Sequence, residues 1–210
     1  MKLTIDQRQA VLASIIGDGY LSYAYSKAKL PRLKWNMGNK DHALYKNEFF
    51  GFLSPTYSER ENGGWGSMTY SVLTSSHPCL KDIHDEFYVE NKKDPNKLSL
   101  IFNELNDVGW AWFYGDDGHL GGNDTVYLHT EGYGEKGSKC CSDAVNNYLN
   151  INDGSKVFMY YGGTPKKERY AVKLTAEASD EFIKRIKKHM ANGMEYKISE
   201  NNINRRYREK

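Results

Sequence analysis

Two nearly apolar segments, each of which closes on Asp-Gly, constrain the fold of this chain more than any other feature. They read VLASIIGDGYL at residues 11–21 and GWAWFYGDDGHL at residues 109–120, and Asp18 of the first aligns with Asp117 of the second at an offset of 99 residues. A helix that is apolar on every side is buried. We therefore expect these two helices to pack against each other at the centre of the molecule.

The segments that follow each helix also agree, which indicates an internal duplication. Residues 71–88 and 171–186 both consist of a strand-like run, a threonine and an amphipathic helical pattern. We therefore expect two halves, residues 1–98 and residues 99–210, the second of which ends in a basic tail.

Hydrophobic periodicity predicts alternating helices and hairpins in both halves, which is typical of an α+β fold with antiparallel sheets. The predicted helices cover residues 7–17, 41–53, 78–88, 107–116, 138–149 and 177–190. The predicted strands cover residues 20–26, 31–38, 56–60, 68–74, 125–131, 155–161 and 168–175, with a turn at Asn62-Gly63-Gly64.

Composition limits the class of protein but names no partner. Hydrophobic residues make up 39% of the 210 residues, and no run approaches the ~18 apolar residues of a membrane span. The first ten residues lack an apolar signal segment, so we expect a soluble intracellular protein. Cys79, Cys140 and Cys141 lack C-x-x-C spacing, which indicates neither a disulfide framework nor a zinc site. The net charge of +2 is too small to indicate a partner, and the 16 tyrosines suit a surface that stacks and donates hydrogen bonds.

The two aspartates at the helix ends suggest the chemistry. If the helices lie side by side, Asp18 and Asp117 emerge together, and two adjacent carboxylates repel unless one is protonated or a cation lies between them. Mg²⁺ prefers carboxylate, phosphate and water oxygens, and such a site suits phosphodiester hydrolysis. In the alternative interpretation each Asp-Gly only ends a helix, with glycine after the last turn. An aspartate beside a helix C-terminal dipole is unfavourable, so its occurrence twice favours a functional role.

The two motifs, with their spacing and flanks, resemble the signature helices of the LAGLIDADG homing endonucleases, in the single-chain form that carries both motifs. The resemblance covers residues 8–197. It implies two pseudo-symmetric αββαββα halves with saddle-shaped antiparallel sheets and a central two-helix interface. It further implies metal-dependent hydrolysis of both strands of double-stranded DNA by a monomer, with Mg²⁺ as cofactor and Mn²⁺ or Ca²⁺ able to substitute in binding.

The same resemblance implies the site residues. The acid before each closing glycine binds metal in this family, which corresponds to Asp18 and Asp117. Asp116 also precedes the second glycine, but the alignment of Asp117-Gly118-His119-Leu120 with Asp18-Gly19-Tyr20-Leu21 selects Asp117. Trp112 and Asp116 depart from the family pattern, which has small residues there. The other implied site residues are the backbone carbonyls of Gly17 and Asp116 at the metal, and the basic residues Lys93 and Lys197 near the scissile phosphates; ordinary solvated lysines are the alternative.

Side chains that alternate away from the core of the predicted strands are candidates for contacts in the DNA major groove. Each is equally compatible with a phosphate contact or plain exposure. Asn36 and Glu131 are also of a type that orients a water molecule. The two halves differ in sequence, so a long asymmetric target is expected. The candidate DNA-binding residues are Ser22, Ser26, Arg32, Lys34, Asn36, Tyr127, His129, Glu131, Arg169 and Lys173.

Three other functions are compatible with parts of this sequence. An intron RNA maturase uses the same fold with RNA as its partner, and a catalytically inactive DNA-binding protein would have lost one of the two motif acids, which are both present. Tyr114-Gly115-Asp116-Asp117 also spells the YGDD motif of viral RNA polymerases. That motif lies in a β-hairpin of far longer chains, whereas its flanks here are helix-like.

Overall fold

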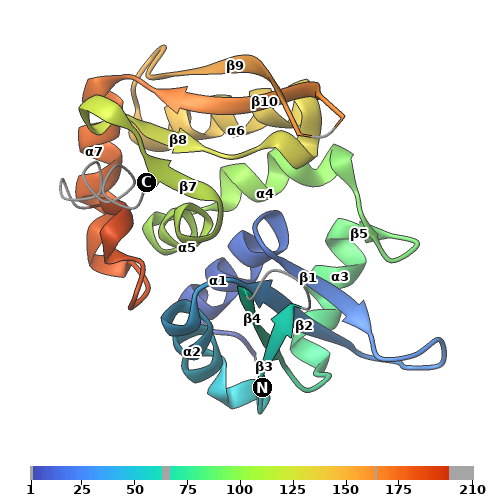
Figure 1. The fold of residues 1–210 in the computed structure, drawn as a ribbon. Helices are drawn as coiled ribbons and strands as arrows, with labels where there is room; N and C mark the ends of the chain where they lie inside the picture. The colour runs from blue at the N-terminus through green and yellow to red at the C-terminus, as the bar shows by residue number, and fades with distance from the viewer. Residues whose placement is uncertain (1, 63–66, 164, 199–210) are drawn as a thin grey trace.

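The computed structural model describes residues 2–62, 67–163 and 165–198, which form two similar α+β halves around a pair of central helices (Figure 1). The first half contains α1 (Ile5–Ile16), β1 (Gly19–Tyr23), β2 (Pro31–Met37), α2 (Lys40–Phe49), β3 (Thr56–Asn62), β4 (Ser67–Leu73), α3 (Lys81–Phe87), β5 (Tyr88–Val89) and β6 (Lys92–Lys93). The second contains α4 (Leu98–Glu104), α5 (Asp107–Asp117), β7 (Gly118–Leu120), β8 (Val126–Leu128), α6 (Gly134–Leu149), β9 (Ser155–Gly162), β10 (Lys167–Leu174) and α7 (Ala176–Ile186).

Each half is built on a four-stranded antiparallel sheet. The strand orders are β1-β2-β4-β3 and β7-β8-β10-β9, so the two sheets share one topology, and β5 and β6 form a separate two-stranded sheet. Alternation along β2 buries Leu33 and Trp35 against the core. Trp35 pairs with Val72 of β4, and Leu128 pairs with Val172 in the second sheet; all four residues are fully buried. The predicted α+β class with antiparallel sheets is confirmed.

The central helices α1 and α5 pack against each other. Thr4 begins α1 with a capping box, in which its side chain accepts from the Gln7 amide and the Gln7 side chain accepts from the Thr4 amide. Asn106 begins α5 by accepting from the amides of its first turn. Residues 9–16 and 108–115 are all buried, as expected for helices that are apolar on every side.

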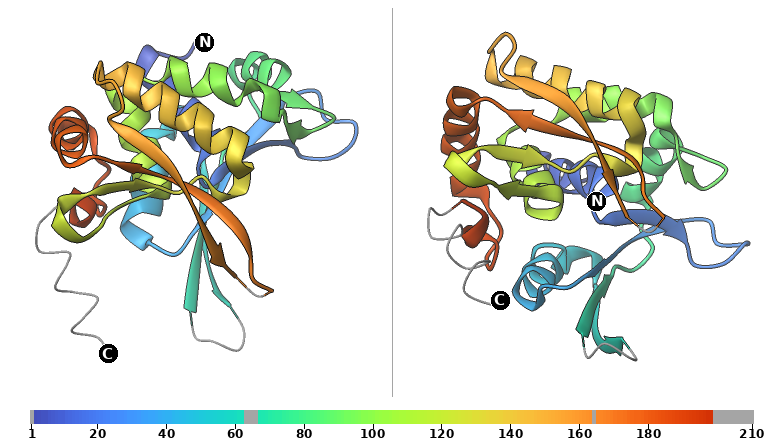
Figure 2. Two further views of the ribbon diagram at one scale, coloured as in Figure 1. Left: turned by 90° about the horizontal axis from the view of Figure 1, so that it is seen from above. Right: turned by 45° about the horizontal axis from the view of Figure 1, so that its top comes forward.

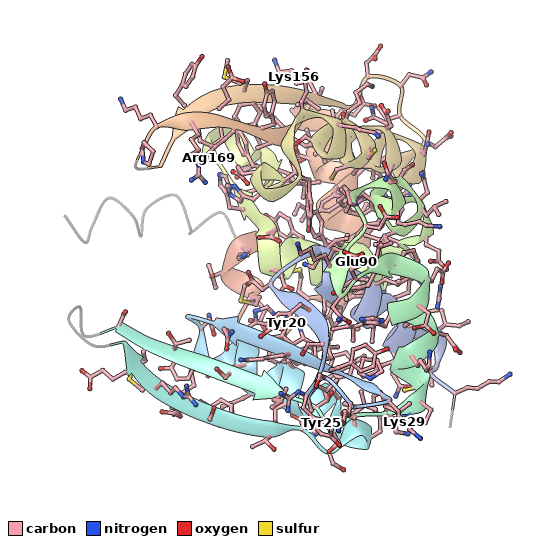
Figure 3. All side chains as sticks on the ribbon, turned by 90° about the vertical axis from the view of Figure 1, so that its right-hand side faces the viewer. Tyr20, Tyr25, Lys29, Glu90, Lys156 and Arg169 are labelled. Carbon is pink, nitrogen blue, oxygen red and sulfur yellow. The ribbon has the colours of Figure 1, made fainter. Side chains whose placement is uncertain are left out.

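Of the remaining helices, α2 and α6 each cover one side of a sheet, and the other side of each sheet is called its uncovered face. Helix α6 packs against β9 and β10, and α2 packs against β3 and β4. Figure 2 shows α6 lying across one face of its sheet. The hairpins β3–β4 and β9–β10 extend past the central helices in the same direction, toward the left of Figure 3.

The structure differs from the sequence prediction at several element ends. The helix predicted over 41–53 stops at Phe49, and residues 51–53 form a 3₁₀ turn that closes at Ser54 with a left-handed φ of 45°. The helix predicted over 78–88 likewise begins as a 3₁₀ turn at Pro78–Leu80. Helix α4 and strands β5, β6 and β7 were not predicted, because segments of two to seven residues show little periodicity.

Two predicted features lie outside the described residues: Gly63 and Gly64 of the predicted turn, and the basic tail with Arg205, Arg206, Arg208 and Lys210. None of the helices in the described parts of the chain has the length and hydropathy that a membrane span requires.

Candidate active site

The two motif aspartates lie at the same end of the central helix pair. At the start of the pair, the side-chain oxygen of Gln9 accepts a hydrogen bond from the Asn106 amide at 2.8 Å. At its end, the Asp18 amide donates to Oδ2 of Asp116 at 3.3 Å. Helices α1 and α5 therefore run in the same direction, and Asp18 and Asp117 both lie where the helices end.

Gly17 allows the two helix ends to approach closely. A Cβ atom added to Gly17 would lie 2.6 Å from Oδ2 and 2.8 Å from Cβ of Asp116, far inside van der Waals contact. Near the start of the pair, a Cβ added to Gly109 would lie 2.4 Å from Oε1 of Gln9. Glycine is thus required by the helix–helix contact at Gly17, whereas at Gly109 the end of the Gln9 side chain would have to shift.

The acids share one electrostatic environment. Burial, followed by repulsion from Asp116 and Asp18, raises the pKa of Asp117 to about 8. Although solvent reaches the Asp18 side chain, partial burial and then the charge of Asp116 raise its pKa to about 6, while Lys46 and other lysines oppose the shift. Concentrated negative charge of this kind is relieved by a proton or a bound cation.

The structure brings Lys93 and Lys197 to these acids. Lys93 ends strand β6, and Lys197 lies in the 3₁₀ turn Glu195–Ile198. Burial lowers the pKa of both ammonium groups, and the nearby carboxylates of Asp117 and Asp116 oppose that shift. Nζ of Lys197 also donates to the Gly115 carbonyl at 2.7 Å, so its positive charge caps the C-terminal end of α5.

Asp116 does not present its carboxylate at this surface. Its side chain is completely buried, with Oδ1 2.6 Å from Nζ of Lys46, whose side chain is also completely buried. Nε2 of His42 lies 3.6 Å from the same oxygen. The Asp116 carbonyl, which the family resemblance assigns to the metal, lies 3.4 Å from Nζ of Lys197.

Aromatic rings enclose this ion pair and explain the departure from the motif at Trp112. Nζ of Lys46 lies 5.4 Å from the ring centroid of Trp35 and 5.2 Å from that of Trp112, within cation–π range. The Trp112 ring also packs against Phe49 and Phe50 of helix α2 and its end. A large residue in the second motif therefore fills the space between α5 and α2.

The candidate DNA-binding residues of the N-terminal half share the uncovered face of the first sheet. Arg32, Lys34 and Asn36 alternate with buried residues along β2. Ser22 pairs with Arg32, so it lies on the same face. Asn36 pairs with Ser71, which donates to its side-chain oxygen at 2.7 Å, so Ser71 of strand β4 lies on the same face. Ser26 is the exception, because it lies in the turn after β1 and not in the sheet.

In the C-terminal half, Tyr127, Arg169 and Lys173 lie on the equivalent face. Lys173 pairs with Tyr127 and places its ammonium 5.4 Å from the ring centroid. Arg169 has the same strand parity as Lys173, and Figure 3 shows it on the side of its sheet that faces the N-terminal half. His129 follows β8, and its amide donates to the Asp117 carbonyl at 2.6 Å.

Glu131 lies outside the strand in which it was predicted, in the turn Glu131–Tyr133. Its Oε1 is 2.8 Å from Nδ1 of His129 and accepts from the Tyr160 hydroxyl at 2.5 Å. Nε2 of His129 lies 2.7 Å from Nδ1 of His119, which continues the hydrogen-bond chain to β7.

Sequence reasoning missed several residues on these faces. Strand register places Tyr20 opposite Lys34, and Arg60 opposite Thr69, on the uncovered face of the first sheet. In the second sheet, His119 stacks on Tyr127, which contacts Phe158 edge to face. The registers of the strand pairs in each sheet would have revealed these positions, but a single sequence does not fix register.

The sequence of this chain was compared with models of known protein families. A sequence profile of the LAGLIDADG DNA endonuclease family matches residues 8–154. The chain belongs to this family. The resemblance indicated by the two motifs is thereby confirmed, and with it the assignment of the protein to the DNA endonucleases.

Individual LAGLIDADG relatives agree with this assignment. Probable intron-encoded DNA endonuclease 3 of Mycosarcoma maydis is 30% identical over 135 residues, which are 62% of this chain and 93% of that protein. The homing endonuclease I-WcaI, solved bound to its DNA recognition sequence, matches with a TM-score of 0.75 at 19% identity over 95% of this chain and 88% of its own. I-DmoI, solved in complex with DNA and Mn, matches with a TM-score of 0.53 at 14% identity over 87% of this chain and 97% of its own. The fold of this chain is therefore that of the LAGLIDADG homing endonucleases.

Proposed function

We propose that this protein is a site-specific homing endonuclease that hydrolyses both strands of double-stranded DNA as a monomer. The observation that carries the proposal is that Asp18 and Asp117 lie at one end of a parallel helix pair in a chain of the DNA endonuclease family. One chain supplies both acids, so no second copy is needed. The proposed halves, residues 1–98 and 99–210, differ in sequence, and the target is therefore long and asymmetric.

We propose Mg²⁺ as the cofactor, with Mn²⁺ and Ca²⁺ able to replace it in binding. Asp18 and Asp117 would hold it, with the backbone carbonyls of Gly17 and Asp116 as further candidate ligands. The donor set fits a hard divalent cation, because both carboxyl groups have raised pKa values that a bound positive charge would lower. When bound, the cation neutralises charge that develops on the scissile phosphate.

Lys93 and Lys197 are the proposed catalytic basic residues. Both ammonium groups are partly buried among the acids, where each would attract a phosphate more strongly than a fully solvated lysine does. Asn36 already accepts a hydrogen bond from Ser71, and Glu131 accepts one from Tyr160, which would hold either side chain still if it orients a water molecule.

The uncovered sheet faces are the proposed DNA-binding surface. Positive side chains there bind phosphates, and polar and aromatic ones contact base edges. The proposed contacts are Ser22, Ser26, Arg32, Lys34, Asn36, Tyr127, His129, Glu131, Arg169 and Lys173. Intron RNA is the partner to be expected if the protein acts as a maturase.

The test is cleavage of a randomised duplex library in Mg²⁺, with the cut ends sequenced. We expect one preferred sequence to be cut by the wild type, and cleavage to fall to background in Asp18→Asn and Asp117→Asn. Asp143→Asn is the matched control, because Asp143 forms an exposed pair with Lys139 on helix α6. Full cleavage by either motif variant would contradict the proposed roles, and binding of intron RNA without DNA cleavage would favour a maturase.

A further inference from the structure

The buried ion pair of Asp116 and Lys46 breaks the symmetry of the molecule. At the motif offset of 99 residues, Asp116 corresponds to Gly17, and Lys46 corresponds to Val145. The buried positions of α2 and α6 support the same offset there, since His42, Ala43 and Lys46 correspond to Cys141, Ser142 and Val145. In the described chain, a glycine and a valine thus occupy the positions equivalent to the two charges.

The two motif helices also end differently. The last residue of α1 is Ile16, so Asp18 lies two residues beyond the helix, whereas Asp117 is the last residue of α5. The hydrogen bonds of α5 continue past Asp117, because the Gly118 amide donates to the Tyr114 carbonyl. The Asp117 backbone is therefore fixed by its own helix.

The backbone of Asp18 is held by a side chain of the other motif helix instead. Its amide donates to Oδ2 of Asp116 at 3.3 Å, and the other oxygen of that carboxylate lies 2.6 Å from Nζ of Lys46. The Asp116 and Lys46 side chains have no exposed surface. The rings of Trp35 and Trp112 flank the ammonium group, so the pair has little freedom to move.

We propose that Asp116 and Lys46 are a positioning pair that fixes Asp18 through its backbone amide. The inference rests on the proposed function and adds to it that each motif acid serves the cut in one strand. The cut that depends on Asp18 then requires the pair, and the cut that depends on Asp117 does not. The Asp116 side chain acts on Asp18 and on Lys46, and its carboxylate does not serve as a metal ligand.

Two double variants isolate the hydrogen bond between the Asp18 amide and the Asp116 side chain. Lys46→Met/Asp116→Ala and Lys46→Met/Asp116→Asn both remove the two charges, so neither leaves a lone buried ion, and only the asparagine keeps an oxygen for the Asp18 amide. Amide hydrogen exchange is measured on the protein without metal or DNA. We expect the Asp18 amide to exchange about tenfold faster in the alanine variant than in the asparagine variant, with residues 108–114 unchanged. Equal exchange in the two variants would overturn the proposal.

The consequence for catalysis is measured on a duplex from the library selection with a different dye on each strand. The ratio of the two strand-cleavage rates does not depend on the fraction of folded protein, because the same molecules make both cuts. We expect this ratio to change by about 10- to 100-fold in the alanine variant and to return toward wild type in the asparagine variant. An unchanged ratio in the alanine variant would overturn the positioning role. If the wild type cuts no DNA, the proposed function fails, while hydrogen exchange still tests the pair.

Discussion

At the end of the helix pair, the missing side chain of Gly17 determines where the Asp116 carboxylate lies. Asp116 occupies space that exists only because Gly17 has no side chain, and its carboxylate then reaches both Lys46 and the Asp18 amide. Lys46 lies in the helix predicted from residue 41, where a lysine is typical of a solvated face. Its partner is 70 residues away in the sequence, so sequence periodicity alone does not predict the pair.

Substitution of Gly17 by alanine tests this close contact. We expect Gly17→Ala to lower the free energy of unfolding by about 1–3 kcal/mol, because the new methyl group would overlap the Asp116 side chain. Urea unfolding followed by tryptophan fluorescence measures the loss. Gly38→Ala is the control, since nothing lies within 4 Å of a Cβ at Gly38, and its effect should stay within about 0.5 kcal/mol. Equal losses in both variants would argue against the contact.

At the scale of helices and strands, alternation predicted the faces well where a strand has one buried side. Arg32, Lys34 and Asn36 lie on the uncovered face as expected. Alternation is less informative on the uncovered face of the second sheet. Phe158 and Tyr160 lie there, and such aromatic residues look like core residues in a sequence. Alternation failed at Glu131, since the strand ends at Leu128 and a turn carries the carboxylate instead.

The Glu131 carboxylate links two strands of the second sheet in a way that depends on pH. Burial alone would raise the pKa of Glu131, but hydrogen bonds from His129 and Tyr160 lower it from 4.5 to about 2. The unfolded chain therefore binds this proton at a higher pH than the folded chain does. The resulting stabilisation is present above about pH 4.5 and is lost as the pH falls toward 2.

We expect Glu131→Gln to lack this part of the pH dependence. The difference in urea midpoint between wild type and variant should be largest above pH 4.5 and should shrink as the pH falls. Tyr160→Phe, which removes one of the two hydrogen bonds, should give a smaller change over the same range. Parallel midpoint curves for wild type and Glu131→Gln would contradict this account.

For the whole molecule, the duplicated motif was sufficient to predict the architecture. Two buried helices that end on aspartate implied a central pair, and the repeated flanks implied two sheets of equal topology. The differences between the halves were not predictable, because they depend on which side chains meet across the pseudo-twofold axis. Asp116 illustrates this, since its carboxylate pairs with Lys46 of the other half, 70 residues away in the sequence, and both side chains are buried.

Binding of DNA across both sheets should depend strongly on salt. We expect Lys34→Ala to weaken binding to the selected duplex and to reduce the slope of log K against log salt by about 1, as loss of one phosphate contact does. Fluorescence anisotropy at several salt concentrations, in Ca²⁺, measures both quantities. Lys139→Ala is the control, because Lys139 is exposed on α6 and pairs with Asp143. An unchanged slope in Lys34→Ala would exclude a phosphate contact at this position.

The Asp116–Lys46 ion pair, to which each half contributes one charge, also determines whether either half alone could form a homodimer. In a homodimer of two N-terminal halves, glycine would face glycine at the axis. Two Lys46 ammonium groups would then be buried in an apolar interior without a carboxylate partner. A homodimer of two C-terminal halves would force two Asp116 carboxylates together with valine in place of each lysine. Each arrangement leaves unpaired buried ions, at a cost of about 3–5 kcal/mol apiece. Each half carries the counter-ion that the other lacks, so we expect the buried pair to favour the intact chain over a homodimer of either half.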